Sequence, residues 1–446
     1  MAAAASAFHA PVAGPKQARD GGGAKLDLVV GGPGYLMELE VDTGKNEVKL
    51  AHNNNLRQAG WTPNWMIKRE NRLYVVDEMS SALSSYAFNP STHTLELKDK
   101  VNGSSGVVHI AINEANTRLV GAAYGEGKVD VWDVSNRDGK LERMVSFPSS
   151  GMFGPLKKKQ AAPHPHQAVL DPTGRYFLVN DLGTDTILVI DSKDDRFGVT
   201  NRVSVLPAGC GPRHGAFYPK YEADLATFNK VFYMVVCEET NNLVVYGAAY
   251  GANNMSLFPV HVVSTYSPDL PPKNASTAAA GGLVLIPRGG NMSGIADVYI
   301  SNRATGYDED HIAHFFFDGN DQGSVQFKDL VKTGGTFPRA ISTVFGNYAI
   351  LAVNQKGEFG LTAFKRDPEN GALDPKPMLK IPNAFFENTK KDFGPQFVMQ
   401  VVHETKPTTT APGGGVHVST FTPVNKAGGA TTSTGTVPAA SAFTTR

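Results

Sequence analysis

One pattern of hydrophobic and polar positions recurs along this chain. Each copy has an apolar stretch rich in β-branched or aromatic residues, a short polar or glycine-containing turn, and a second apolar stretch. β-branched and aromatic side chains suit a pleated sheet, so the two stretches predict the strands of a hairpin. The seven copies lie at 26–50, 72–97, 118–141, 175–199, 230–257, 297–325 and 347–373.

The spacing of the copies predicts the fold class. A repeat of roughly 45 to 65 residues is typical of the four-stranded blades of a β-propeller. A further short apolar stretch precedes most copies and supplies another strand. No segment keeps an apolar period of about 3.6 residues, so few helices are expected. We therefore predict an all-β, seven-bladed β-propeller of four-stranded antiparallel blades.

The ends of the repeat array predict how the ring closes. No strand precedes the first copy, whereas the last copy is followed by GPQFVMQVVH at 394–403, which resembles an innermost strand without a blade of its own. We expect this segment to pair with the blade that begins at 26–50. N- and C-terminal strands would then share one blade, which removes the open edge of a linear array.

The repeats define one domain, flanked by two tails. We expect the propeller to span 25–404, with a disordered tail at 1–24 and a disordered Thr/Ala/Gly/Pro-rich tail at 405–446. The N-terminal residues lack a basic start and an uninterrupted apolar stretch, so a cytoplasmic location is expected. Secretion is the alternative, and it would make the sequons at Asn102, Asn274 and Asn291 relevant.

Composition narrows the classes of partner. The 42 Lys and Arg residues balance 42 Asp and Glu residues, and such neutrality argues against a nucleic-acid partner. No apolar run reaches the ~18 residues of a membrane span. We expect Cys210 and Cys237 to be free thiols. Both fall near the same end of one blade, so a disulfide is the alternative. The oligomeric state is left open.

Chemically distinctive residues gather at two positions of the repeat. One is the start of the innermost strand and the other is the turn between the second and third strands, and antiparallel alternation places both on one face. Turns need Gly, Asp, Asn and Pro, but not the His, Arg and Glu residues found here. The pattern predicts a site at one mouth of the central channel. The segments are 164–166, 211–214 and 337–339 at the first position, and 180–183, 237–239 and 301–303 at the second.

These segments carry a family likeness. HPHQAVLDPTGRYFLVNDLGTDTI, GPRHGAFYP, YISNR and FPRAISTVFGNYAILAVNQKGEFGLTAFKRDPENGAL resemble the seven-bladed lactonase family, which includes propeller-type 6-phosphogluconolactonases and fungal carboxy-muconate cyclases. The likeness covers most of 26–403 and neither tail. It implies catalytic roles for four residues, with Glu239 as an alternative to Glu238. They are His166, Arg213, Glu238 and Arg303.

Those residue types fit lactone hydrolysis. A histidine can activate water near neutral pH, and an arginine can stabilise an oxyanion or bind an anionic group bidentately. We expect a small anionic lactone as substrate, with no cofactor and no metal. Substrate contacts are also expected from His164, Asp181, His214 and Arg339. The structural alternatives are packing for the two histidines, a turn for Asp181 and blade bracing for the arginines.

Three functions follow from these residues. The leading hypothesis is a metal-independent lactonase acting on an anionic sugar lactone such as 6-phosphogluconolactone. The second is a carboxy-cis,cis-muconate cyclase, an intramolecular lyase that would use the arginines as carboxylate clamps. The third is a propeller that serves as a binding platform without turnover. No cluster of Asp and Asn ligands indicates a calcium-dependent lactonase.

Overall fold

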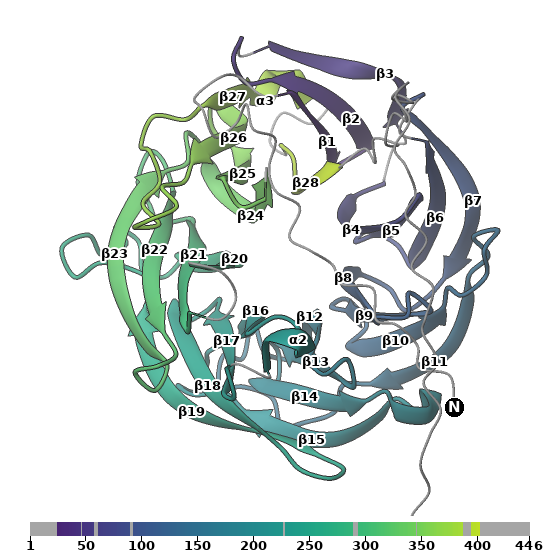
Figure 1. Cartoon of the computed structure of the whole chain (residues 1–446), viewed down its shortest axis with the longest axis vertical. Helices are drawn as coiled ribbons and strands as arrows, with labels where there is room; N and C mark the ends of the chain where they lie inside the picture. The colour runs from purple at the N-terminus through teal and green to yellow at the C-terminus, as the bar shows by residue number, and fades with distance from the viewer. Residues whose placement is uncertain are drawn as a thin grey trace, which may run out of the picture. The chain divides into compact units, whose positions relative to one another are not determined.

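The computed structural model describes residues 25–45, 47–57, 61–89, 92–225, 228–288, 293–344, 346–386 and 394–401. These residues form seven four-stranded antiparallel sheets, which Figure 1 shows arranged in a ring. The predicted seven-bladed β-propeller is therefore confirmed. The expected tails at 1–24 and 405–446 lie outside the described residues.

Blades are numbered here in chain order, with strands given from the channel outwards. Blade 1 contains β28 (Phe397–Val401), β1 (Lys25–Gly32), β2 (Tyr35–Asp42) and β3 (Glu47–Arg57). Blade 2 contains β4 (Pro63–Arg69), β5 (Arg72–Asp77), β6 (Ala82–Asn89) and β7 (Thr94–Asn102). Blade 3 contains β8 (Val107–Ile112), β9 (Arg118–Ala123), β10 (Lys128–Asp133) and β11 (Glu142–Pro148).

The remaining four blades follow the same order. Blade 4 contains β12 (Pro165–Leu170), β13 (Tyr176–Asp181), β14 (Thr186–Asp191) and β15 (Gly198–Ser204). Blade 5 contains β16 (Pro212–Tyr218), β17 (Val231–Cys237), β18 (Asn242–Tyr250) and β19 (Met255–Ser264). Blade 6 contains β20 (Ala279–Pro287), β21 (Ile295–Arg303), β22 (His311–Asp318) and β23 (Ser324–Lys332). Blade 7 contains β24 (Thr336–Val344), β25 (Ala349–Lys356), β26 (Phe359–Lys365) and β27 (Leu379–Pro382).

The ring closes in blade 1 as the sequence predicts. Strand β28 pairs antiparallel with β1, with Val29 opposite Met399 and Gly31 opposite Phe397. The C-terminal strand is thus the innermost strand of the blade that the N-terminal repeat supplies. Figure 1 shows the C-terminal β28 beside the N-terminal β1.

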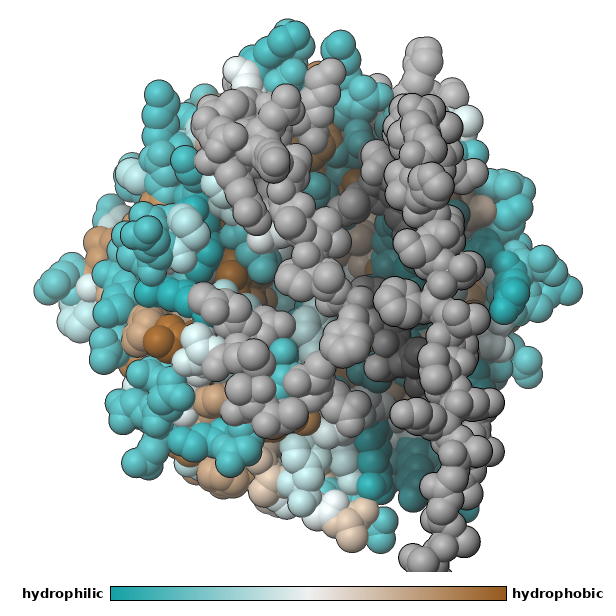
Figure 2. All heavy atoms as spheres, in the orientation of Figure 1, coloured by the Kyte–Doolittle hydropathy of each residue, from teal (hydrophilic) through white to brown (hydrophobic). Residues whose placement is uncertain are grey.

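Burial follows the position of a strand in its blade. Middle strands such as β13 are buried along their whole length, because both of their faces pack against neighbouring blades. Outermost strands such as β15 alternate between exposed and half-buried residues. This explains why the sequence shows continuous apolar runs at inner strands and alternation at outer ones. Figure 2 shows a largely hydrophilic outer edge, with hydrophobic side chains in small groups.

Helices are few in the part of the chain that is described. They are the 3₁₀ helix η1 (Lys193–Asp195) and the α-helices α2 (Glu222–Leu225) and α3 (Asn383–Phe386). None of the helices in the described ranges has the length and apolar character needed to cross a bilayer. The low helix content matches the missing 3.6-residue period.

The innermost strands share an irregularity that shapes the channel mouth. In blades 2 to 7 the pairing of the innermost strand with the second strand shifts register near its first residues. Such a β-bulge redirects a side chain that regular pairing would hold in the sheet. Several of the residues at the bulges turn out to line one cavity. They are Asn64, Val108, His166, Arg213, His214 and Arg339.

Candidate active site

An ion-pair cluster joins blades 5 and 6 at this mouth. Arg213 lies in the β16 bulge, Glu238 directly follows β17, and Arg303 is the last residue of β21. Arg213 Nε lies 2.6 Å from Glu238 Oε2, and Arg303 Nη2 lies 2.8 Å from the same oxygen. One carboxylate oxygen therefore holds two guanidinium groups.

Burial and charge act in opposite directions on this cluster. Burial alone would raise the pKa of Glu238, but Arg303 and Arg213 outweigh it and hold the pKa below its ordinary value. Burial, reinforced by the neighbouring charge of Arg303, lowers the pKa of Arg213 to about 9. Glu238 and Arg213 are consequently both charged at neutral pH.

The two arginines retain unused hydrogen-bond donors. Arg213 Nε faces Glu238, but Arg213 Nη1 and Arg303 Nε are buried and find no hydrogen-bond partner among the described residues. The Arg213 side chain is only 3% exposed. Leaving one buried donor unsatisfied costs about 1–3 kcal/mol, and native structures rarely retain such groups without a reason. These donors are suited to an acceptor that a ligand brings.

Glycine makes room for Arg303. A Cβ atom at Gly281 would lie 2.6 Å from Ser301 Oγ and 3.1 Å from Arg303 Nε. Gly281 falls within the register shift of β20, where blades 2 to 5 and blade 7 carry bulkier residues. Blade 6 therefore supplies a cation, Arg303, from the end of its second strand β21, and Gly281 in its innermost strand β20 leaves space for that side chain.

Three histidines face one another beside Arg213. The ring centroids of His166 and His214 lie 5.3 Å apart, and those of His109 and His214 lie 5.8 Å apart. Burial, followed by the charge of Arg213, holds the pKa of His166 and of His214 well below 6.5. The same two causes lower the pKa of His109 to about 3. All three imidazoles are therefore neutral near pH 7.

Two of these histidines have an unused ring nitrogen. Nδ1 of His166 and Nδ1 of His109 are buried and have no hydrogen-bond partner within the described ranges. A neutral imidazole with an unengaged nitrogen can accept a proton from water or from a hydroxyl group. Arg213 also keeps these rings uncharged, because protonation would place two cations side by side.

The cavity is lined by both charged and uncharged side chains. The residues that line it are Asn64, Trp65, Val108, His166, Arg213, His214, Arg339, Ala340 and Gln396. Arg339 Nη2 donates to Glu78 Oε2 at 2.7 Å. In contrast to the arginine donors, Asn64 Oδ1 and Gln396 Oε1 are uncharged acceptors. Both are buried and have no hydrogen-bond partner in the described part of the chain. Such acceptors suit hydroxyl groups of a ligand.

Sequence reasoning missed several uncharged residues of the site. Asn64, Trp65 and Gln396, which line the cavity, and His109, which lies behind them, were not among the expected site residues. Trp65 packs against His109 with a centroid distance of 4.0 Å. A signal was available, because a proline precedes Asn64, His166, Arg213 and Arg339 alike at the start of an innermost strand. His109 lacks this proline and could be found only from the repeat position.

The expected site residues divide into two groups. The structure brings together His166, Arg213, Glu238, Arg303, His214 and Arg339. His164 lies one ring away, stacked on Tyr124 at 4.3 Å, and Tyr124 in turn makes an edge contact with His166. Glu239, the alternative to Glu238, pairs with Lys159 instead.

Asp181 is placed as a turn residue. Its Oδ1 accepts hydrogen bonds from the backbone N–H groups of His164, Gly183 and Thr184 at 2.7, 2.9 and 3.2 Å. Its Oδ2 accepts from Ser149 Oγ. The carboxylate is fully buried, and it does not line the cavity. The geometry is that of its structural alternative.

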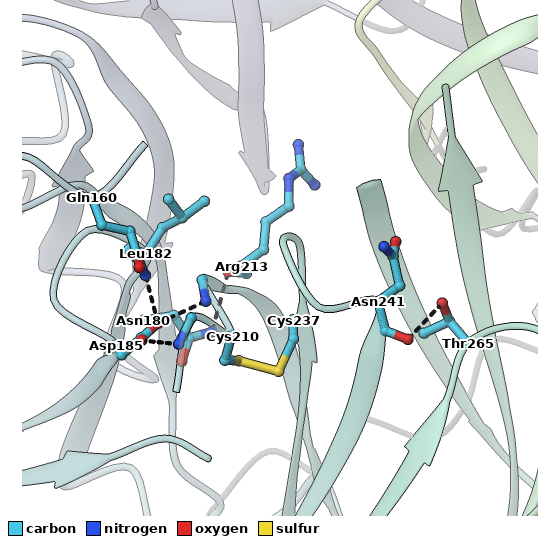
Figure 3. The surroundings of a disulfide bond; sticks show 11 residues. Gln160, Asn180, Leu182, Asp185, Cys210, Arg213, Cys237, Asn241 and Thr265 are labelled. Carbon is cyan, nitrogen blue, oxygen red and sulfur yellow. Dashed lines mark hydrogen bonds between the residues drawn. A yellow bond between two sulfur atoms is a disulfide. The ribbon is translucent and has the colours of Figure 1, made fainter. Parts of the chain in front are cut away.

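The expectation of free thiols at Cys210 and Cys237 is wrong. The two residues form a disulfide, with their Cα atoms 4.6 Å apart. Cys237 ends β17 opposite Pro212, and the loop before β16 brings Cys210 beside it. A separation of 27 residues hides this proximity, since it depends on the pairing register of β16 and β17. Figure 3 shows the bridge and the Arg213 side chain extending away from it.

One further group has the spacing of a metal site. Ligand atoms of Asp27, Glu38 and His93 lie within 4.8 Å of one another. His93 Nδ1 is 2.9 Å from Glu38 Oε1. Oxygen and nitrogen ligands of this kind suit Zn²⁺. These residues do not line the cavity, and the hydrolysis considered below needs no ion from them.

Comparison with known proteins identifies the family. A family model described as "Lactonase, 7-bladed beta-propeller" matches residues 31–385. The chain belongs to this family. A probable 6-phosphogluconolactonase of Arthroderma benhamiae is 32% identical over 272 residues, which span 59% of this chain and 62% of that protein. The 6-phosphogluconolactonase of Bacillus subtilis is 28% identical over 352 residues, spanning 77% of this chain and 90% of that protein.

Solved structures agree on the fold. A putative 6-phosphogluconolactonase from Bacteroides fragilis has a TM-score of 0.65 at 21% identity, and the match covers 85% of this chain and 98% of the other. The periplasmic gluconolactonase PpgL of Pseudomonas aeruginosa has a TM-score of 0.66 at 21% identity, covering 85% and 99%. At this identity the likeness extends to the propeller fold alone.

Proposed function

We propose that this lactonase-family protein hydrolyses an anionic sugar lactone, such as 6-phosphogluconolactone, in the cavity at the channel mouth. The observation that carries the proposal is the buried, charged Arg213, whose unused donors lie beside the neutral His166. An anionic substrate would satisfy those donors, and a neutral imidazole is the form that can act as a base. The names of the relatives support the choice of substrate class.

His166 is the proposed general base. Its unengaged Nδ1 takes a proton from water while the water oxygen attacks the lactone carbonyl carbon. The carbon–oxygen bond of the ring then breaks, and the leaving alkoxide takes the proton held by His166, which gives the open-chain acid and restores the neutral imidazole. Because the His166 pKa lies well below 6.5, the base form persists at neutral pH, although its low basicity limits the driving force for proton transfer.

The arginines are proposed to stabilise negative charge. Arg213 is placed to donate to the carbonyl oxygen as it becomes an oxyanion, or to the anionic group of the substrate. Glu238 keeps Arg213 and Arg303 oriented from one oxygen. Arg339, held by Glu78 at another edge of the cavity, is available for the second anionic position. Three arginines against two glutamates leave a net positive charge for an anion.

The test is hydrolysis of freshly made 6-phosphogluconolactone by the purified full chain in the presence of EDTA. We expect saturable activity that EDTA does not remove. Arg213→Ala should lower kcat/KM by about 10³-fold, of the size seen when one oxyanion-hole donor is removed. Arg175→Ala, which removes an arginine paired with Asp191 away from the cavity, should stay within about twofold as the matched control.

Other outcomes would contradict the proposal in distinct ways. Equal activity in wild type and Arg213→Ala would reject the site. No rate above spontaneous hydrolysis would reject this substrate, and the same preparation would then be tested for cyclisation of carboxy-cis,cis-muconate. The arginines can also bind a polycarboxylate, so turnover of carboxy-cis,cis-muconate would favour the cyclase. Tight binding of an acid without turnover would favour a binding platform. The expected cytoplasmic location stays a prediction.

A further inference from the structure

The disulfide joins the two segments that carry the ion pair. Cys210 precedes Arg213 by three residues, and Cys237 directly precedes Glu238. Figure 3 shows the bridge spanning from the loop before β16 to the end of β17. Both cysteines are fully buried. A covalent link therefore joins the segment that carries Arg213 to the segment that carries Glu238.

The link lies beside an interruption in the pairing of β16 with β17. Pro212 pairs with Cys237, but the next paired residues are Gly215 and Val235. Arg213 and His214 occupy the intervening bulge. A bulge leaves its extra residue outside the ladder and disrupts the local hydrogen bonds. The disulfide thus joins the end of β17 to the loop before β16 just beyond the Pro212–Cys237 pair, next to this interruption.

Backbone contacts continue the link towards the site. The Glu238 N–H donates to the Gly211 carbonyl at 2.9 Å, and the Glu239 N–H donates to the Cys210 carbonyl at 3.0 Å. Gly211 has a positive φ of 61°, and a Cβ atom there would lie 2.8 Å from Glu239 Cγ. Only glycine allows the two segments to approach so closely at this residue.

A buried carboxylate holds the other side of the same loop. Asp185 accepts hydrogen bonds from the N–H groups of Gly209 and Gly211 at 2.5 and 2.8 Å, and from Gln160 Nε2 at 2.6 Å. Asp185 belongs to the turn after β13 in blade 4. The loop is consequently fixed to blade 4 by hydrogen bonds and to β17 by the disulfide, as Figure 3 shows.

We propose that the Cys210–Cys237 disulfide is a positioning element of the active site, which holds the Glu238 carboxylate against Arg213 so that the unused Arg213 donors face the cavity. The proposal rests on the proposed function for its substrate and on the geometry for its mechanism. Without the bridge, the Glu238 turn keeps its two backbone bonds to the loop but loses the covalent tie. Arg213 would then sample orientations that do not serve the substrate.

The test compares Cys210→Ala, Cys237→Ala and the double variant with the full-length wild type. Each should lower kcat/KM for the lactone by about tenfold or more, since a misplacement of about 1 Å can cost as much as 10²-fold. Both single variants should match the double variant, because either one removes the whole bridge. Val244→Ala is the matched control, as it truncates a buried residue of the same blade-5 core cluster without touching the link, and it should change kcat/KM less than twofold.

A double-mutant cycle separates positioning from a general loss of packing. If the bridge acts through Glu238, removing it in a Glu238→Gln background should cost little further activity. The Val244→Ala effect should instead be unchanged in that background. Full additivity of the cysteine and Glu238 variants would overturn the proposal, as would wild-type kcat/KM in the double cysteine variant.

Binding of inorganic phosphate distinguishes this proposal from the proposed function. Calorimetric titration of phosphate needs no turnover, so it reports on Arg213 even if the lactone is not the substrate. We expect a higher Kd for phosphate in the double cysteine variant and an unchanged Kd in Val244→Ala. Phosphate binding that depends on Arg213 but is equal with and without the bridge would overturn the positioning role.

Discussion

Strand β21 carries a charged cluster at each end, and the two clusters differ in one respect. Near its start, Asp297 is fully buried between Arg288, Arg366 and His314. At its other end, Arg303 joins Arg213 on Glu238. Both clusters place several charges in a protected setting. Only the second retains buried nitrogens without hydrogen-bond partners in the described part of the chain.

The Asp297 cluster shows what a structural solution looks like. Arg288 Nε lies 2.9 Å from Asp297 Oδ1 and His314 Nε2 lies 2.8 Å from it, while Arg366 holds Oδ2. Burial would raise the pKa of Asp297, but these partners lower it to about 2. Arg366 follows β26 and therefore links blade 7 to blade 6. The cluster fastens two blades and leaves no function open to a ligand.

The Arg213 cluster shows the cost of keeping a site ready. Its donors wait for an acceptor, and its histidines are uncharged because burial and Arg213 oppose their protonation. Buried donors without partners lower the stability of the folded protein but leave it ready to bind a ligand, a trade-off that is common at functional sites. The difference between the clusters leads to opposite expectations for stability and for activity.

The largest expected effect is on folding at the structural end. Asp297→Ala leaves Arg366 and His314 buried without their shared counter-charge, so the free energy of unfolding should fall by about 3–5 kcal/mol. Activity per folded molecule should remain close to wild type. Urea unfolding followed by tryptophan fluorescence, with an assay on the folded fraction, measures both quantities.

Asp297→Asn is the matched variant, because it keeps the shape of the side chain and some hydrogen bonds. Its cost should fall between those of wild type and Asp297→Ala. A cost below about 1 kcal/mol for Asp297→Ala would break the comparison, since that is the size expected of an exposed ion pair.

A smaller effect is expected in the pH dependence of stability. His109 has a pKa of about 3 in the folded protein and about 6.5 when unfolded. Its contribution to the free energy of unfolding is therefore fully present above pH 6.5. This contribution is lost as the pH falls towards 3, at up to about 1.4 kcal/mol per pH unit. His109→Gln should flatten the decline of unfolding free energy between pH 6.5 and 5, as measured by urea titrations.

The pKa of His314 is shifted in the opposite direction from that of His109. Burial lowers its pKa, but hydrogen bonds to Asp297 and Asp329 outweigh this and raise the pKa above 6.5. Its contribution to the free energy of unfolding is present below pH 6.5 and is lost as the pH rises through the pKa of His314 in the folded protein. His314→Gln should therefore cost more at pH 5.5 than at pH 8.5. Parallel pH profiles for both variants and wild type would remove the proposed difference between the two clusters.

Much of the fold could be predicted from sequence because it depends on repeated local patterns. The hairpin repeats gave the seven blades, and the unpaired segment 394–403 gave the closure that β28 and β1 form. His166, Arg213, Glu238 and Arg303 could be placed at one mouth because strand direction alternates. These inferences need only the order of strands.

The features that sequence reasoning missed depend on register and side-chain direction. The disulfide requires knowing that Pro212 lies opposite Cys237. Asn64 and Val108 line the cavity because bulges redirect them. Asp181 was expected to contact substrate, but its carboxylate is occupied by its own turn and Ser149. A sequence shows which residues are near a loop, and not which way each side chain points.

The central claim is that the unused Arg213 donors await an anion, and calorimetric titration of 6-phosphogluconate, the product of the proposed reaction, tests it most directly. Wild type should bind this acid saturably, and Arg213→Ala should raise the Kd by about 10²-fold, as expected for a buried charge-assisted contact. Equal affinity in both proteins would show instead that Arg213 is a structural brace like Arg366, and would contradict the account.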